Sequence, residues 1–199
     1  MPEIVVVRHG ETEWSVARRH TGRTDLPLTA AGERAARALR PWLAGRRFGL
    51  VLVSPLERAR RTARLAGLDG EVDDDLAEWD YGGYEGLTTA EIRERLGRPW
   101  SIWDDGTVPG ATPGESIDEV ASRVRRVITR VEPVLDTGDD VALVAHGHSL
   151  RILAACWLGL PPSAGGLLVL GAGSVGTLGF EHDRHALTGW NQRPPSGPR

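Results

Sequence analysis

Two stretches, Ile4–Gly10 (IVVVRHG) and Val141–His148 (VALVAHGH), each lead from a short apolar run into a His-Gly pair. Short apolar runs of this kind are typical of strands that are buried on both faces of a parallel sheet. In such sheets, ligands bind just beyond the carboxyl ends of the strands. We therefore expect His9 and His146, which are far apart in the sequence, to meet in one site.

Strands and helices alternate along the rest of the chain. The first strand covers residues 3–7 and the last parallel one 141–145; others are predicted over 49–53 and 71–76, with a closing hairpin of 167–170 and 174–180. Helices are predicted over 29–43, 56–65, 88–96, 116–135 and 149–158, with Thr29 and Ser116 as N-caps, Gly67 as a helix end, and Pro133 ending or kinking its helix. This alternation predicts a three-layer α/β/α fold with a mostly parallel central sheet.

One domain is expected over residues 1–192, since no change of composition divides the chain. Residues 78–116 form an excursion that is rich in glycine, tryptophan and turn residues and too long for a plain connection. Such segments commonly carry binding or lid functions, so we expect this one to cover the site. The Pro/Ser/Gly-rich tail, 193–199, is expected to be disordered.

The composition excludes several kinds of chemistry. With 199 residues and a net charge of −3, the chain has no general attraction to nucleic acid. All 24 basic residues are arginines, which excludes a Schiff-base lysine and a lysine-bearing phosphate loop. The single cysteine, Cys156, excludes an internal disulfide and fits a cytoplasmic location. No stretch approaches the ~20 apolar residues of a membrane span.

Several short motifs stand in an order that belongs to a known family. Arg8–Thr12 (RHGET) resembles the signature of the histidine phosphatase superfamily, also called phosphoglycerate mutase-like (branch 1). Its further elements resemble Gly22–Thr29 (GRTDLPLT), Ser54–Ala59 (SPLERA), Leu76–Gly82 (LAEWDYG) and Ala145–Gly147 (AHG). The series covers residues 4 to about 160 and is far more specific than any single motif. The resemblance implies phosphoryl transfer without a cofactor or metal.

The resemblance also assigns roles to five residues. His9 would be the nucleophile, and Arg8 and Arg58 would clamp the phosphoryl oxygens, because guanidinium forks suit bidentate contact with phosphate. His146 would donate a hydrogen bond to the phosphoryl group, as would backbone N–H groups of helix N-termini. Glu78 would protonate the leaving oxygen and then activate water. Because Glu78 must start protonated, we expect an activity maximum on the acid side of neutral.

The predicted substrate contacts surround these five residues. They are Ser15, Thr21, Gly22, Trp79, Tyr81, Gly147 and His148. Many family members carry asparagine in place of Ser15, so we expect a weaker phosphate contact there. Trp79, Tyr81, Trp100 and Trp103 would form an aromatic wall that favours aryl or apolar leaving groups; alternatively, the tryptophans anchor the excursion to the body of the domain.

The phosphatases and the mutases of this family are expected to differ in the residue that follows Glu78. Mutases typically place there an arginine that grips a carboxylate, whereas this chain has Trp79. Arg93, Arg95 and Arg98 are followed by aromatic and acidic residues, which grip a polyanion poorly. We therefore predict a phosphatase for small phosphomonoesters, similar to broad-specificity acid phosphatases. A phosphoglycerate mutase-type phosphotransferase is the alternative.

Two interpretations come from other classes of protein. A non-catalytic binding module of the same fold is disfavoured because all five assigned residues are present. A metal-dependent hydrolase is suggested by His146 and His148, but zinc needs three or four ligands, and His20, His182 and His185 form no HExxH-type pair. The edge of the closing hairpin could support a homodimer.

Overall fold

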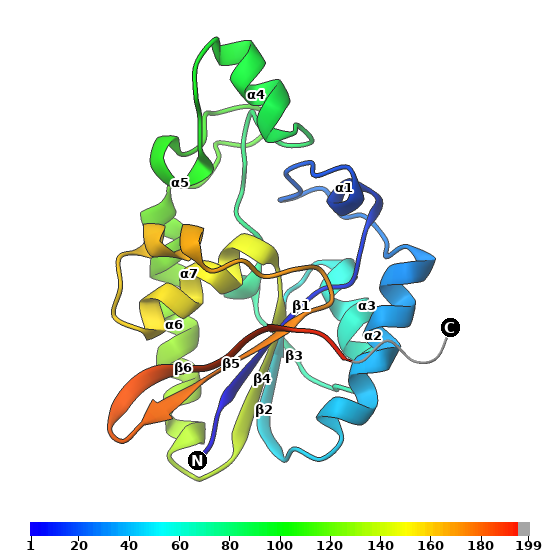
Figure 1. The fold of residues 1–199 in the computed structure, drawn as a ribbon, viewed down its shortest axis with the longest axis vertical. Coiled ribbons are helices and arrows are strands. Elements are labelled where there is room, and N and C mark those ends of the chain that lie inside the picture. Colours follow the sequence, from blue (N-terminus) through cyan, green and yellow to red (C-terminus); the bar gives the residue numbers. More distant parts are fainter. Residues whose placement is uncertain (195–199) are drawn as a thin grey trace.

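A six-stranded sheet lies at the centre of the computed structural model, which describes residues 1–194 (Figure 1). Its strands are β1 (Ile4–Arg8), β2 (Phe48–Val53), β3 (Glu71–Val72), β4 (Asp140–Ala145), β5 (Val175–Glu181) and β6 (Arg184–Gln192), in the spatial order β3-β2-β4-β1-β5-β6. The first four are mutually parallel, whereas β5 and β6 are antiparallel additions at one edge. The predicted α/β fold with a mostly parallel sheet is confirmed.

Helices cover both faces of this sheet. One face carries α2 (Ala30–Leu43) and α3 (Glu57–Ala66), and the other carries α6 (Ile117–Leu135) and α7 (Gly147–Trp157) (Figure 1). Successive side chains of a strand point to opposite faces. In β1, Ile4 and Val6 therefore join the core under α6 and α7, while Val5 and Val7 join the core under α2 and α3. Burial on both sides explains the uninterrupted apolar run of this strand.

Three predicted helix boundaries are confirmed. The Thr29 side chain accepts a hydrogen bond from the Gly32 backbone at 3.0 Å and caps α2. Ser116 and Glu119 form a reciprocal capping box at the start of α6. Gly67 ends α3 with a positive φ of 77°, which glycine adopts without strain.

Other boundaries differ from the prediction. The closing hairpin consists of β5 and β6, because residues Pro162–Leu167 form a 3-10 helix, η2, rather than leading into a strand. The sequence of β6 is mostly polar and exposed, as befits an edge strand, so it lacks an apolar signal. The weak strand predicted over 71–76 is only β3 followed by a 3-10 turn, η1 (Asp74–Leu76). Pro133 does not end α6, which continues to Leu135.

Short helices lie above the carboxyl ends of the strands. They are α1 (Glu13–Val16), α4 (Thr89–Leu96) and α5 (Ile102–Asp105) (Figure 1). The last two belong to the excursion, and its Trp79, Tyr84 and Trp100 are buried in the main core. Aromatic packing therefore fixes the excursion over the strand ends. Across residues 1–194, every helix is too short or too polar to cross a membrane.

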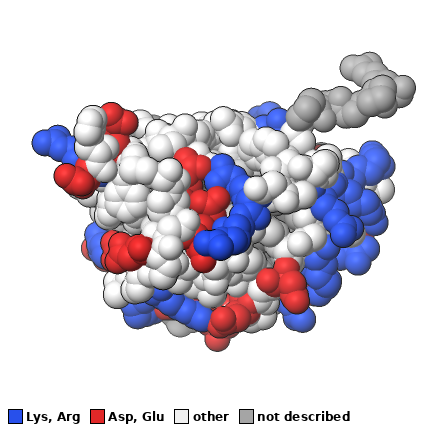
Figure 2. All heavy atoms as spheres, turned by 90° about the horizontal axis from the view of Figure 1, so that it is seen from below, with Lys and Arg blue, Asp and Glu red and all other residues white. Residues whose placement is uncertain are grey.

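The opposite end of the sheet is held by charged groups. Arg46 contacts both Glu3 and Asp140 at 2.8 Å, and the backbone N–H of Glu3 donates to Asp140 at 2.9 Å. These residues lie next to the amino-terminal ends of β1, β2 and β4. On the face seen from below, acidic and basic side chains stand side by side (Figure 2).

A contact between two backbones fixes the chain next to His9. A Cβ atom on Gly32, in the first turn of α2, would lie 2.2 Å from the carbonyl oxygen of Glu11. A Cβ atom on Gly10 would lie 2.5 Å from the carbonyl oxygen of Gly32. Only glycines allow α2 to start this close to the end of β1.

We predict that Gly32→Ala lowers the free energy of unfolding by about 1–3 kcal/mol, because the added methyl group must push two backbones apart. Urea unfolding measures this change. Gly45→Ala is the control: no atom lies within 4 Å of its Cβ position, so we expect a change within about 0.5 kcal/mol. Equal stability of Gly32→Ala and the wild type would contradict the close contact.

Candidate active site

The two histidines meet at the carboxyl ends of β1 and β4. These strands pair in parallel with Arg8 opposite Ala145, so the residues that follow them lie side by side. The ring centroids of His9 and His146 are 5.1 Å apart. The structure thus brings together the residues that the two His-Gly stretches indicated.

The imidazole of His9 has one nitrogen free to react. Its Nδ1 donates to the carbonyl oxygen of Gly10 at 2.7 Å, which leaves the lone pair on Nε2. Burial, and then the positive charges of Arg58 and Arg8, lower the pKa of His9 well below its ordinary value. The ring is therefore neutral, the form that a nucleophile requires.

His146 has both ring nitrogens engaged. Its Nδ1 accepts a hydrogen bond from Nε of Arg58 at 3.1 Å, so the neutral ring carries its proton on Nε2, which donates to Oγ of Ser54 at 2.6 Å. Burial, followed by the charge of Arg58, lowers its pKa well below the ordinary value. In this arrangement the N–H group of His146 is directed at Ser54, and its role as a donor to a phosphoryl group stays a prediction.

Arg58 is fully buried and mostly occupied. Beyond the bond to His146, its Nη1 donates to the carbonyl oxygen of Thr24 at 2.8 Å. Its Nη2 donates to those of Thr21 and Gly22, both at 3.0 Å. These contacts use four of the five N–H groups of a guanidinium. Arg58 therefore ties the loop at residues 21–24 to the site, rather than presenting a free fork to phosphate.

Arg8 keeps an unpaired donor. Its Nη1 donates to the carbonyl oxygen of Leu170 at 2.5 Å, while its Nε is buried and has no partner among the described residues. A Cβ atom on Gly147 would lie 3.1 Å from Cζ of Arg8, so this glycine makes room for the guanidinium. A buried N–H group without a partner is costly, and an anion beside it would remove that cost.

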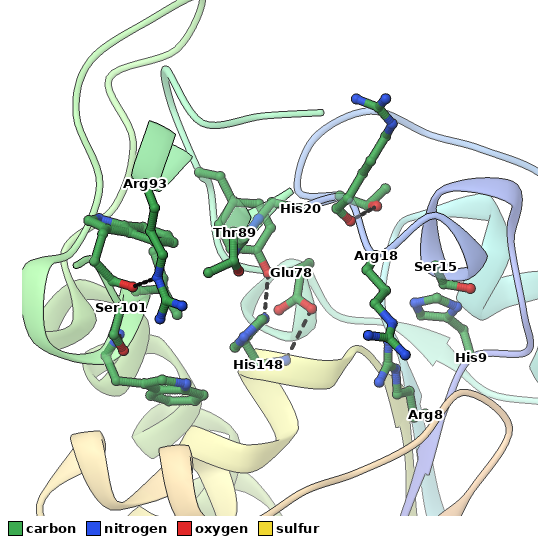
Figure 3. A pocket seen from close by; sticks show the side chains of 16 residues that line it. Arg8, His9, Ser15, Arg18, His20, Glu78, Thr89, Arg93, Ser101 and His148 are labelled. Carbon is green, nitrogen blue, oxygen red and sulfur yellow. Dashed lines mark hydrogen bonds between the residues drawn. The ribbon is translucent and has the colours of Figure 1, made fainter. Parts of the chain in front are cut away.

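Glu78 is held by the first turn of α7. Its Oε1 accepts from the backbone N–H groups of Trp79 and Ser149, both at 2.9 Å, and its Oε2 accepts from that of His148 at 3.1 Å. The helix N-terminus that was expected to bind phosphate thus binds the carboxyl group of Glu78 instead (Figure 3).

A cavity of about 400 Å³ opens above these groups (Figure 3). It is lined by Arg8, His9, Ser15, Arg18, Arg19, His20, Thr21, Glu78, Tyr81, Thr89, Arg93, Trp100, Ser101, Ile102, Trp103 and His148. Of the predicted residues, Arg58, His146, Gly22, Trp79 and Gly147 are not in this lining. Arg58 and His146 are fully buried. Gly22 accepts a hydrogen bond from Arg58, and Gly147 makes room for the guanidinium of Arg8.

The predicted aromatic wall is only partly correct. Trp79 is fully buried, and its Nε1 donates to the carbonyl oxygen of Glu115 at 2.8 Å, so it anchors the excursion. Tyr81, Trp100 and Trp103 do line the cavity. The hydroxyl of Tyr81 lies 2.6 Å from Nδ1 of His148, which fixes both side chains.

Sequence analysis missed part of the cavity lining. His20 was considered only as a metal ligand, and Arg93 was assigned to a segment that binds anions poorly. The lining residues not considered at all are Arg18, Arg19, Thr89, Ser101 and Ile102. Charged residues next to a four-residue helix look like an ordinary solvated surface. Their position just before the Thr21–Gly22 element was the available signal.

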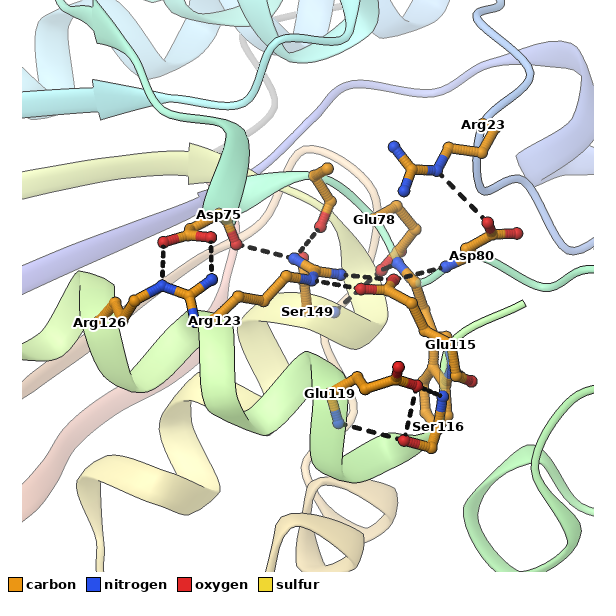
Figure 4. Close-up of polar contacts among 12 residues, drawn as sticks. Arg23, Asp75, Glu78, Asp80, Glu115, Ser116, Glu119, Arg123, Arg126 and Ser149 are labelled. Carbon is orange, nitrogen blue, oxygen red and sulfur yellow. Dashed lines mark hydrogen bonds and ion pairs between the residues drawn. The ribbon is translucent and has the colours of Figure 1, made fainter. Parts of the chain in front are cut away.

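A buried ion pair supports Glu78 from behind (Figure 4). Arg123, on α6, contacts both oxygens of Glu115, at 2.8 and 3.1 Å, and donates to the carbonyl oxygen of Ala77 at 2.6 Å. Glu115 in turn accepts from the backbone N–H of Asp80 at 2.9 Å. Arg123 therefore holds the chain on both sides of Glu78.

Comparison with known proteins identifies the family. Residues 4–193 match the model of the histidine phosphatase superfamily (branch 1). The chain belongs to this superfamily. An acid phosphatase of Mycobacterium tuberculosis is 39% identical over 187 residues, covering 90% of this chain and 87% of the relative. A probable phosphoglycerate mutase of Photorhabdus laumondii is 34% identical over 197 residues, covering 96% and 90%.

Solved structures agree with this membership. The structure of an open reading frame product of Mycobacterium tuberculosis superimposes with a TM-score of 0.88 at 36% identity, and the match covers 97% of this chain and 98% of that one. The superfamily and its phosphatase-named relative support a phosphatase activity for this chain. Among the side chains of residues 1–194, no cluster of three or more His, Cys, Asp or Glu is arranged to hold a metal ion.

We predict that Arg123→Met lowers the free energy of unfolding by about 3 kcal/mol, because it leaves the Glu115 carboxylate and the Ala77 carbonyl without their partner. Arg126→Met, on the same helix, is the matched control. Arg126 pairs with Asp75 but is 61% exposed, so its loss should cost less than about 1 kcal/mol. Urea denaturation of both variants measures the difference, and equal losses would refute the supporting role of Arg123.

Proposed function

We propose that the protein is a phosphomonoester phosphatase that works through a phosphohistidine on His9. One observation carries the proposal: the cavity is lined both by a neutral His9 with a free lone pair on Nε2 and by Arg8, which has a buried, unpaired N–H group. A nucleophile next to an unsatisfied donor suits attack on an anionic phosphoryl group.

In the first step, Nε2 of His9 attacks phosphorus while the bond from phosphorus to the ester oxygen breaks. Glu78 gives its proton to that oxygen, and the alcohol leaves. In the second step, Glu78 takes a proton from water, the water oxygen attacks phosphorus, and the bond to Nε2 breaks to release phosphate. Arg8 stabilises the charge on the phosphoryl oxygens in both transition states.

Hydrolysis is favoured over mutase-type transfer by what surrounds Glu78. The position that holds an arginine in typical mutases is Trp79, which is buried and has its indole N–H bound to the backbone. It offers no grip for a substrate carboxylate, and the phosphohistidine would meet water. The mutase alternative is still supported by the relative from Photorhabdus laumondii that is named a probable phosphoglycerate mutase.

The leaving group would lie against the excursion. Tyr81, Trp100 and Trp103 support acceptance of aryl groups, because these aromatic residues are part of the cavity lining. Arg18 and Arg93 also line it, so we no longer expect a preference against negatively charged leaving groups.

We predict that the protein hydrolyses p-nitrophenyl phosphate, that excess EDTA changes the rate by less than about twofold, and that His9→Ala lowers kcat/KM by about 10⁴-fold or more. Parallel assays of p-nitrophenol and inorganic phosphate separate the two family activities. Equal release of both products supports a phosphatase, whereas phosphate release that lags with an added alcohol acceptor supports a phosphotransferase. An EDTA-sensitive rate would instead indicate a metal-dependent hydrolase.

We predict that Glu78→Gln lowers kcat/KM for alkyl phosphates by about 10²-fold or more, but for p-nitrophenyl phosphate by less than about tenfold, since nitrophenolate leaves without a proton. The wild-type rate with alkyl phosphates, whose leaving oxygen must be protonated, should be highest on the acid side of neutral. The lowered pKa of His9 favours the neutral ring that the attack requires. Equal losses with both substrates would remove Glu78 from the general-acid role.

A further inference from the structure

The short helix α1 ends with an arginine where glycine is usual. Arg18 has a φ of +56°, in the left-handed region. Its backbone N–H donates to the carbonyl oxygen of Ser15 at 3.3 Å, and that of Arg19 donates to Trp14 at 2.9 Å. These two bonds are those of a Schellman motif, whose left-handed position favours glycine because a Cβ atom is crowded there. The chain carries this strain at a residue that lines the active-site cavity.

The side chain of Arg18 turns into the cavity. In the view of Figure 3 it points toward Arg8 and His9, and all three residues line the cavity. No hydrogen bond or ion pair to the Arg18 side chain is formed by residues 1–194. Two positive groups that share a cavity repel each other. The carboxylate of Glu78 offsets part of this charge at Arg8, and an anion bound between the two arginines would offset more of it.

The other arginines of the lining are held by protein groups. Nη1 of Arg19 donates to the carbonyl oxygen of Gly86 at 2.6 Å and lies 3.6 Å from Glu91. Nε of Arg93 donates to the carbonyl oxygen of Trp100 at 3.0 Å. Arg18, which is exposed, is therefore the lining arginine whose side chain has no hydrogen-bond or ion-pair partner among residues 1–194.

We infer that Arg18 is a phosphate-binding residue that grips the phosphoryl group together with Arg8. Arg58 has four of its N–H groups bound to His146 and to backbone carbonyls, so it leaves room for a second arginine at the phosphoryl oxygens. Arg18 supplies that arginine from the turn that follows α1. The inference rests on the proposed function, because it places the transferring phosphoryl group beside His9.

Titration calorimetry with inorganic phosphate tests the inference on the full chain. Arg18→Gly should weaken phosphate binding by about tenfold, the loss of one charge-assisted contact. The same variant should raise Tm by about 2–4 °C, because glycine relieves the left-handed strain. A residue with a merely structural role cannot give weaker binding together with higher stability.

Three variants serve as controls. His182→Gly relieves a φ of +54° in the exposed turn between β5 and β6, so it should raise Tm and leave phosphate affinity unchanged. Arg95→Gln removes one exposed positive charge of α4 outside the cavity lining and should change the affinity by less than about twofold. Arg18→Lys keeps the charge and should retain part of the affinity.

The inference is overturned if Arg18→Gly binds phosphate within about twofold of the wild type. It is equally overturned if Arg95→Gln weakens binding as much, or if the wild type binds no phosphate at about 10 mM. Failure of the proposed function looks different: phosphate binds and depends on Arg18, but p-nitrophenyl phosphate is not hydrolysed.

Discussion

The parallel pairing of β1 with β4 is the constraint on which the rest of the structure depends. Their register places Arg8 opposite Ala145, so that both strands end at the same level. A slip by one residue would turn the buried side chains of β1 toward the opposite layer. It would also separate the strand ends where the rings of His9 and His146 now lie 5.1 Å apart. Apolar packing on both faces of the sheet thus sets the distance between His9 and His146.

That same burial controls the charges of the site. Removal from water lowers the pKa of Arg8 and of Arg58, while the nearby carboxylate of Glu78 acts in the opposite direction. Burial and these guanidinium groups together keep His9 neutral. The result is an imidazole that resists protonation, in surroundings whose positive charge attracts a dianion. An imidazole in water would be largely protonated on the acid side of neutral and could not attack. Burial beside positive charges opposes that protonation, so an imidazole nucleophile is compatible with a reaction on the acid side.

Signals that act over a few residues were sufficient for much of the fold. The apolar runs of β1 and β4, the cap at Thr29 and the capping box at Ser116 depend on neighbours in sequence, and each is where it was expected. The polar edge strand β6 was missed because an exposed strand needs no apolar run.

The site was predictable in its members but not in its hydrogen bonds. The motif order indicated Arg58 and His146, yet the carbonyl oxygens that occupy Arg58 come from a loop at residues 21–24 that only the tertiary fold brings near. The direction of Arg18 depends on a left-handed backbone that arginine does not suggest. Which donors remain free is a property of the assembled structure.

The first turn of α7 has a consequence for how such a site can change. Its amide groups at His148 and Ser149 bind the carboxyl group of Glu78. These two amides are therefore occupied, whereas the unpaired N–H group of Arg8 that can meet a phosphoryl group belongs to a side chain. Backbone amides survive any substitution, whereas side-chain donors can be gained or lost one codon at a time. The anion affinity of this protein is thus open to stepwise evolutionary adjustment, while the acid held by the helix stays in place.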